Sequence, residues 1–130
     1  MFEAETQHIR IEVIPAFLDE QSEPEENRYV WSYTIRIINQ GEQQVQLISR
    51  YWHITDAIGQ VQEVQGQGVV GEQPVLDPGD EFEYTSGTPL STASGIMRGH
   101  YMMHNAEGEA FKVEVPAFSL DCPYESHSLN

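Results

Sequence analysis

Three glycines and one arginine are the residues whose types and spacing point most directly to chemistry. Gly66, Gly68 and Gly71 form a G-x-G-x-x-G pattern. In a dinucleotide-binding unit this turn follows a strand and opens a helix, whose N-terminus receives a pyrophosphate. Backbone N–H groups of a glycine loop can also surround an anion without a helix. The stretch is therefore a candidate site for a nucleotide or pyrophosphate, with Arg50 as an additional cation.

The residues after the glycines do not fit a dinucleotide-binding unit. Pro74 and the dipeptide Pro78-Gly79 interrupt the chain where the helix should begin, and Val69 and Val70 are poor helix formers. A net charge of −15, from six basic and 21 acidic residues, also repels phosphate groups. The sequence favours a structural loop whose glycines supply positive φ or close packing. Ligand binding at this loop stays the alternative.

Patterns for metal binding and catalysis are weak. His100 and His104 lie roughly 13 Å apart on a strand, because each residue adds about 3.3 Å, so they do not share one zinc ion. The acidic segment 19–27 lacks the ligand pattern of a calcium loop. No G-x-S-x-G motif occurs, and Cys122 has no evident activating base. We predict no enzyme activity, no catalytic residue, no metal site and no cofactor, and leave open weak binding of Co²⁺ or Mg²⁺.

Composition indicates the setting in which the protein acts. The negative charge disfavours nucleic acids and anionic membranes as partners. One cysteine cannot form an intrachain disulfide, which is typical of a reducing compartment. The first residues show no signal-peptide pattern, and the apolar runs are too short to span a membrane. We expect a cytoplasmic protein with a single domain over residues 1–130.

Alternation of apolar and polar residues predicts an all-β fold. The strongest pattern lies in 29–38, where aromatic and β-branched residues share one face. The segments predicted as strands are 8–17, 29–38, 45–55, 60–65, 81–85, 96–104 and 110–115. A change of phase near Ile48 predicts either a β-bulge or burial of this segment on both faces. Residues 86–95 are predicted as a loop and 116–130 as an irregular C-terminal tail. Seven or eight short strands indicate an antiparallel immunoglobulin or fibronectin type III-like sandwich, with a barrel of similar strand number as the alternative.

Aromatic residues divide into predicted core and predicted surface positions. We expect Trp31, Tyr33, Phe82 and Tyr84 in the core, because they alternate along strands. Tyr101 is the candidate for a tyrosine corner, a tyrosine that ties back a loop in such sandwiches. Trp52 lies in the segment where the phase shifts, beside Arg50. An exposed tryptophan next to arginine is a typical anchor for a protein partner.

Several motifs together resemble the ApaG family, also described as the DUF525 domain. The resemblance rests on the stretch from Gly66 to Leu90, on Ser49-Arg50-x-Trp52-x-Ile54-Thr55-Asp56, and on Pro116-x-Phe118-Ser119-Leu120. Asp80 and Ala93 depart from the family pattern, which usually has Glu and often Pro there.

The resemblance implies a fibronectin type III-like β-sandwich with no catalytic residue. It implies a link to cobalt and magnesium tolerance for bacterial members. It also implies a protein-interaction role where the domain is appended to an F-box protein or a polymerase-interacting protein. We therefore expect a non-enzymatic binding module that engages another protein through a strand edge or end loops. Whether the chain forms a homo-oligomer stays open.

Overall fold

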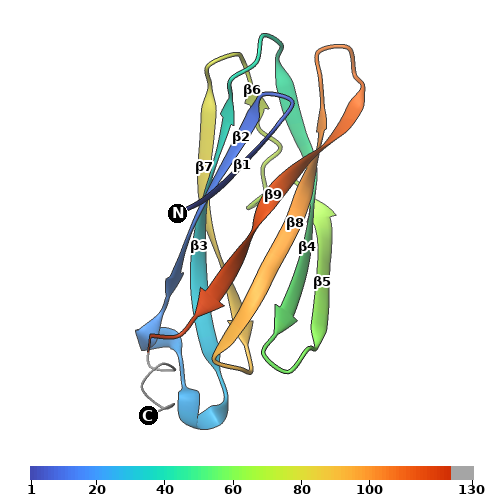
Figure 1. The fold of residues 1–130 in the computed structure, drawn as a ribbon. Coiled ribbons are helices and arrows are strands. Elements are labelled where there is room, and N and C mark those ends of the chain that lie inside the picture. The colour runs from blue at the N-terminus through green and yellow to red at the C-terminus, as the bar shows by residue number, and fades with distance from the viewer. Residues whose placement is uncertain (124–130) are drawn as a thin grey trace.

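Two antiparallel sheets pack face to face in the computed structural model, which describes residues 1–123 (Figure 1). The first sheet has the order β1 (Phe2–Thr6), β2 (Ile9–Phe17), β3 (Tyr29–Asn39) and β7 (Glu81–Leu90). The second has the order β5 (Val61–Gln67), β4 (Val45–Asp56), β8 (Ser94–His104) and β9 (Ala110–Asp121), with β6 (Val75–Leu76) paired to β4. Two 3-10 turns, η1 (Asp19–Gln21) and η2 (Pro24–Glu26), connect β2 to β3. The predicted all-β sandwich is confirmed.

The hydrophobic core lies between the two sheets, where alternate residues of each strand point inward. Tyr33, Ile35 and Ile37 of β3 are buried, as the alternation along this strand predicts. Trp31 and Tyr84 are buried as expected, and Phe82 packs against the core while partly exposed. Burial of these side chains removes apolar surface from water, which is the main force holding the two sheets together.

A β-bulge at Ile48 sets which side chains of β4 reach the core. The pairing of β4 with β8 shifts register between Leu47 and Ser49, so Ile48 is the extra residue. Of the two explanations for the change of phase, the structure shows the bulge. After the bulge, Trp52 is buried between the sheets, and the next residue in each direction points to the outer face.

Three stretches predicted as irregular are strands. Residues 86–90 extend β7 and pair with β3, and 94–95 begin β8. Pairing with a central strand overrides the low β-propensity of Ser, Gly and Pro. Residues 116–121 continue β9 rather than forming a tail. Pro116 fits because β9 is the edge of its sheet and shifts register between Met97 and Gly99 of β8. The strand β1 has no predicted counterpart, and residues 124–130 of the predicted tail lie outside the described part.

Tyr101 does not form a tyrosine corner. Its hydroxyl group lies 2.6 Å from the hydroxyl of Tyr84, and both side chains are buried. Tyr101 therefore pairs with a side chain of the opposite sheet across the core, and the prediction that it ties back a loop is wrong.

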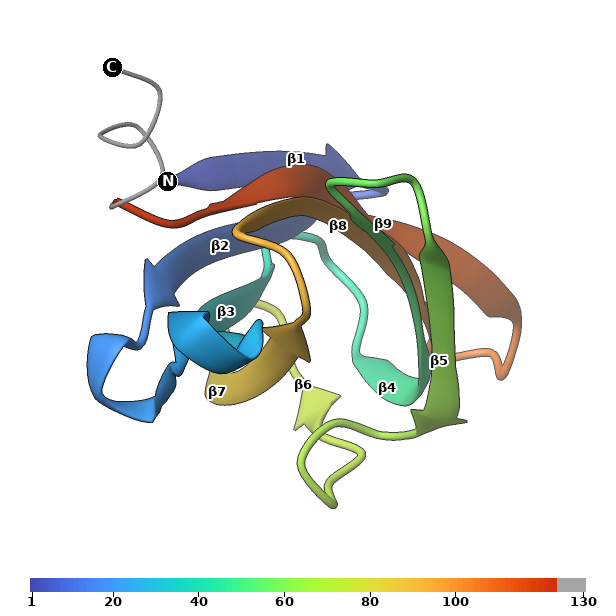
Figure 2. The same ribbon diagram turned by 90° about the horizontal axis from the view of Figure 1, so that it is seen from below.

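The two sides of the sandwich differ in how their strands are covered. In the end-on view of Figure 2, β1 and β9 lie side by side, and the Glu114 N–H donates to Thr6 Oγ1 at 3.3 Å. On the other side β6 lies between β7 and β4, and β5 stands at the outer edge. No helix within residues 1–123 is long and apolar enough to cross a membrane.

Candidate functional site

The glycine loop forms a tight turn after β5. The Gly68 N–H donates to the Ile48 carbonyl at 2.8 Å. The Val69 N–H donates to the Glu72 carbonyl at 2.8 Å, and the Glu72 N–H donates to the Val69 carbonyl at 2.9 Å. Val70 and Gly71 have φ angles of 44° and 81°, as in a type I′ turn. Three backbone N–H groups of the loop are therefore bonded to protein carbonyls and do not point together at an anion site.

Arg50 is held by the same loop. Its Nη1 donates to the carbonyls of Gln67 and Gly68 at 3.1 and 3.0 Å. Gly66 lies opposite Arg50 in the ladder, and a Cβ atom there would lie 2.7 Å from Nη1. The glycine thus leaves room for the guanidinium group. Gly66 and Arg50 therefore have a structural role that requires no ligand.

Trp52 is not exposed. Only 3% of its surface is accessible, and its ring packs edge-on against Tyr33, Tyr101 and Phe118, with centroids 5.4 to 6.2 Å apart. The bulge at Ile48 explains the error, because it turns Trp52 inward. The prediction of an exposed anchor at Trp52 is therefore wrong, and the residue belongs to the core.

Two hollows lie at opposite ends of the sandwich. One of about 650 Å³ is bordered by amide-bearing side chains around the buried Asn39, and one of about 360 Å³ lies around Arg28 and Asp56. Neither is lined by Gly66, Gly68, Gly71 or Arg50. Within residues 1–123, no three His, Cys, Asp or Glu side chains are arranged to hold a metal ion.

The outer face of the second sheet brings together aromatic, histidine and cationic side chains from three strands. Tyr51 and His100 are opposite each other on β4 and β8, and their rings stack at 5.0 Å and 26°. The Tyr51 hydroxyl donates to Glu63 Oε2 on β5 at 2.8 Å. We call this surface the Tyr51 face; its outward residues include Tyr51, Glu63, His53, Ile96, Arg98, His100, Met102, Lys112 and Glu114.

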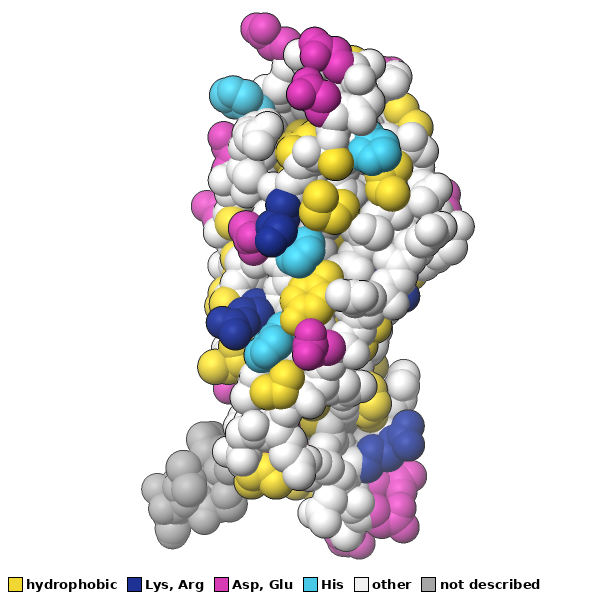
Figure 3. Space-filling view, turned by 90° about the vertical axis from the view of Figure 1, so that its right-hand side faces the viewer, with side chains coloured by type: hydrophobic (Ala, Val, Ile, Leu, Met, Phe, Trp, Pro, Cys, Tyr) yellow, Lys and Arg dark blue, Asp and Glu magenta, His cyan; other side chains and the backbone are white. Residues whose placement is uncertain are grey.

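The cations of the Tyr51 face are not engaged by carboxylates. No carboxylate oxygen of residues 1–123 lies within 4.0 Å of a side-chain nitrogen atom of Arg98 or Lys112. Two carboxylates lie on the same face: Glu63 is opposite His53, and Glu114 is opposite His100. Their two negative charges balance the positive charges of Arg98 and Lys112, so the centre of the face carries no net formal charge. Figure 3 shows histidine, basic and hydrophobic side chains along the middle of this side, with single acidic groups among them and larger acidic clusters at the top and lower right.

Two histidines on the Tyr51 face have unusual surroundings. The Nδ1 atom of His53 is buried without a hydrogen-bond partner in the described part of the chain. Partial burial lowers the pKa of His100, and the nearby Lys112 lowers it further while Glu114 opposes the shift. Neutral His100 is therefore favoured, which suits a ring stacked on tyrosine.

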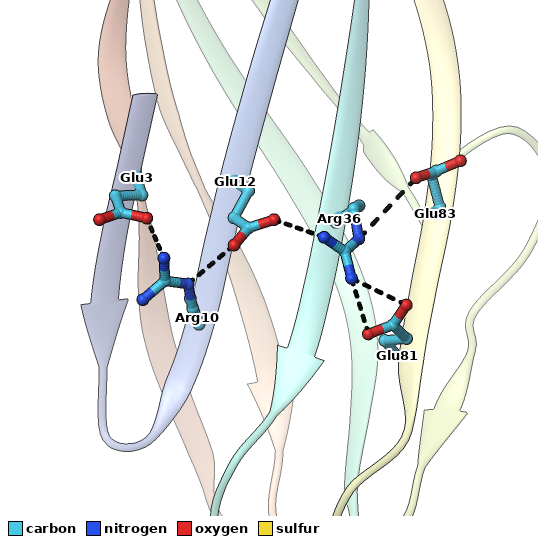
Figure 4. A network of polar contacts seen from close by, with 6 residues as sticks. All are labelled: Glu3, Arg10, Glu12, Arg36, Glu81 and Glu83. Atoms are coloured by element: carbon cyan, nitrogen blue, oxygen red, sulfur yellow. Dashed lines mark hydrogen bonds and ion pairs between the residues drawn. The ribbon is translucent and has the colours of Figure 1, made fainter. Parts of the chain in front are cut away.

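The outer face of the first sheet has a different character. Its charges form one chain of ion pairs across four strands (Figure 4). Arg10 pairs with Glu3 and lies 2.9 Å from Glu12, which in turn lies 2.8 Å from Arg36. Arg36 also contacts Glu81 at 2.9 Å and Glu83 at 3.9 Å. Both cations of this face are therefore already occupied, unlike Arg98 and Lys112.

The sequence analysis missed the Tyr51 face, although part of the signal is present in the sequence. Once a bulge is placed at Ile48, alternation puts Tyr51 and His53 on the face opposite Trp52. Which residues of β8 and β9 lie beside them depends on sheet order and register, which the sequence does not show.

Two antiparallel sheets packed around one hydrophobic core place the chain among small β-sandwich proteins. The model of the ApaG domain matches residues 19–105, and the chain belongs to this family. It is 58% identical to Protein ApaG of Brucella canis, 57% to that of Mesorhizobium japonicum and 58% to that of Paramagnetospirillum magneticum, each over 130 residues and 100% of both chains.

A solved structure agrees with this assignment. The crystal structure of a putative ApaA protein from Bordetella pertussis superposes with a TM-score of 0.87 at 49% identity, covering 88% of this chain and 94% of that chain. The resemblance to the ApaG family is therefore confirmed.

Proposed function

We propose that the protein is a non-enzymatic module that binds another protein through the Tyr51 face. The observation that carries this proposal is the contrast between the two outer faces. One face pairs its cations within the chain, whereas the Tyr51 face leaves Arg98 and Lys112 without carboxylates beside a stacked Tyr51–His100 pair. Tyr, Met and Arg are enriched in protein interfaces, and this face carries all three.

The charges suggest what kind of partner fits. Arg98 and Lys112 would donate hydrogen bonds to carboxylates of the partner, and Ile96, which is 55% exposed, offers apolar contact beside them. The net charge of −15 repels strongly acidic molecules at long range. We therefore expect a protein of neutral or positive net charge that presents a few carboxylates at the contact.

Affinity capture from the native cell extract, followed by calorimetry with the purified partner, tests the proposal. Arg98→Glu and Tyr51→Ala should each weaken binding by about thirtyfold or more if these residues form the centre of the interface. Ile14→Ala is the matched control, because Ile14 is an exposed apolar residue on the other sheet. Binding that all variants retain equally would contradict the proposed surface. A tight small-molecule ligand with no protein partner would contradict the proposed function.

Polar groups of the glycine loop are bonded within the chain. Its N–H groups at Gly68, Val69 and Glu72 bond to carbonyls, and its arginine is bonded to the loop itself. No observation on the described residues favours a nucleotide there over the structural role.

A further inference from the structure

The outer edge of β5 is an open strand edge. β5 ends the order β5-β4-β8-β9 and pairs with β4 alone among the described strands. Figure 2 shows it at the margin of the sandwich, away from the side where β1 covers β9. The strand β7 also ends a sheet, but it carries Glu81, Glu83 and Pro89. Charged residues and proline are typical protections of an edge.

β5 lacks these protections. The segment Val61–Gln67 contains no lysine and no proline, and Glu63 is its one charged residue. Its seven residues pair with β4 without a register shift, so no bulge turns the edge aside. An unprotected edge of this length is a template for pairing with another strand.

Hydrogen bonds at both ends of the β4–β5 ladder show which backbone groups are free. The Gly68 N–H donates to the Ile48 carbonyl at 2.8 Å, and the Asp56 N–H donates to the Gln60 carbonyl at 3.0 Å. Bonded pairs alternate along an antiparallel ladder, so the even-numbered residues of β5 bond to β4. The odd-numbered residues Val61, Glu63, Gln65 and Gln67 therefore direct their N–H and C=O groups toward the open edge, where the Gln67 carbonyl also accepts from Arg50.

The geometry points to a second copy of this chain as the occupant, with two β5 strands pairing antiparallel about a two-fold axis at Val64. This register sets Glu63 of each copy opposite Gln65 of the other and satisfies both residues' edge-facing backbone groups. Shifting the axis to Glu63 would place two carboxylates directly opposite each other, which is unfavourable. Shifting it to Gln65 would set Val61 opposite Val69, whose N–H and carbonyl groups are both bonded to Glu72 within the turn.

The charge distribution is compatible with self-pairing at this edge. Each chain carries −15, but β5 itself contributes one charge, and salt at physiological concentration screens charges beyond about 8 Å. Pairing would join two second sheets into one continuous sheet. The two-fold axis would be perpendicular to that sheet, so both Tyr51 faces would lie on the same side. The inference does not depend on the proposed function.

Sedimentation equilibrium of the purified full chain measures the dimer dissociation constant and tests this pairing. Opposite charges placed at residue 65 should change that constant in opposite directions. Gln65→Lys sets a cation opposite Glu63 of the other copy and should tighten the dimer. Gln65→Glu sets two carboxylates opposite each other and should weaken it. Because each dimer contains the pair twice, we expect changes of about two- to thirtyfold in opposite directions. Gln62→Lys and Gln62→Glu are matched controls, since Gln62 lies on the same strand but bonds toward β4.

Further readouts make the outcome decisive. Raising the salt concentration should strengthen the dimer, because it screens the repulsion between two acidic chains. Hydrogen exchange should slow at the Glu63 and Gln65 amides on dimerisation. A chain that stays monomeric at millimolar concentration would overturn the inference. So would a dimer whose protected amides lie elsewhere, or Gln65 variants that behave like the Gln62 controls. Loss of partner capture by Arg98→Glu in a chain that still dimerises would separate this edge from the Tyr51 face.

Discussion

At Gly68, backbone conformation and close packing both exclude a side chain. Its φ angle is 66°, and a Cβ atom would lie 2.4 Å from the Glu72 carbonyl oxygen. Gly71 has a similar φ angle of 81°, but a Cβ atom there would meet nothing within 4 Å. The two glycines of one motif therefore serve different needs, because one provides space and positive φ and the other provides positive φ alone.

This difference predicts unequal effects of alanine at the two positions. Gly68→Ala should lower the free energy of unfolding by about 2–4 kcal/mol, because strain and a backbone clash act together. Gly71→Ala should cost about 1–2 kcal/mol from the left-handed backbone alone. Urea unfolding followed by circular dichroism measures both. Equal losses for the two variants would show that the clash at Gly68 is relieved by movement of the turn.

At the scale of elements, the chain of ion pairs joins all four strands of the first sheet. Glu12 is its central member, since it bridges Arg10 and Arg36 from adjacent strands while only 8% exposed. A largely buried carboxylate with two charged donors contributes more than an exposed surface pair, which adds little. The outer members are more exposed, and Glu83 contacts Arg36 at only 3.9 Å.

Removing the central carboxylate should therefore have the larger effect. Glu12→Gln should lower the free energy of unfolding by about 1–3 kcal/mol, because two charge-assisted hydrogen bonds are weakened at a buried position. The matched control Glu83→Gln should show no measurable change. Urea denaturation at low and high salt compares them. A stability of Glu12→Gln equal to that of the control would mean that the chain of ion pairs does not join the strands energetically.

At the scale of the whole molecule, the two sheets meet around paired tyrosine hydroxyl groups. Burial raises the pKa of both Tyr84 and Tyr101 above the ordinary value of 10.0. The neutral phenols are therefore favoured in the folded state. Their contribution to stability is fully present below pH 10 and is lost as the pH rises above the unfolded pKa, because the unfolded chain then releases protons more readily.

Alkaline unfolding tests this coupling between the sheets. We expect the free energy of unfolding to fall as the pH rises above about 10, with tyrosinate absorbance of the buried pair appearing only as the chain unfolds. The double variant Tyr84→Phe/Tyr101→Phe should show a shallower fall, since it removes both ionisable groups without leaving one unpaired. Tyr29→Phe, which keeps the pair intact, should retain the steep fall. A double variant as steep as the unmodified protein would contradict the assignment.

The sequence alone determined the fold class and the family, and it marked Ile48 as a place where the strand pattern changes. Period-two alternation in β3 requires one face to be buried. The break in phase at Ile48 fits a bulge or burial on both faces, and pairing with β8 shows that it is a bulge. The motifs around Gly66 to Leu90 identified the ApaG family.

Only the tertiary structure decided where the candidate site lies. Trp52 and Tyr51 are neighbours in the chain, yet one fills the core and the other forms the candidate surface, because the bulge fixes which side chain points inward. Sheet order placed Arg98 and Lys112 beside Tyr51 and left β5 as the open edge. Order and register arise from long-range pairing between strands, which local patterns along the chain do not encode.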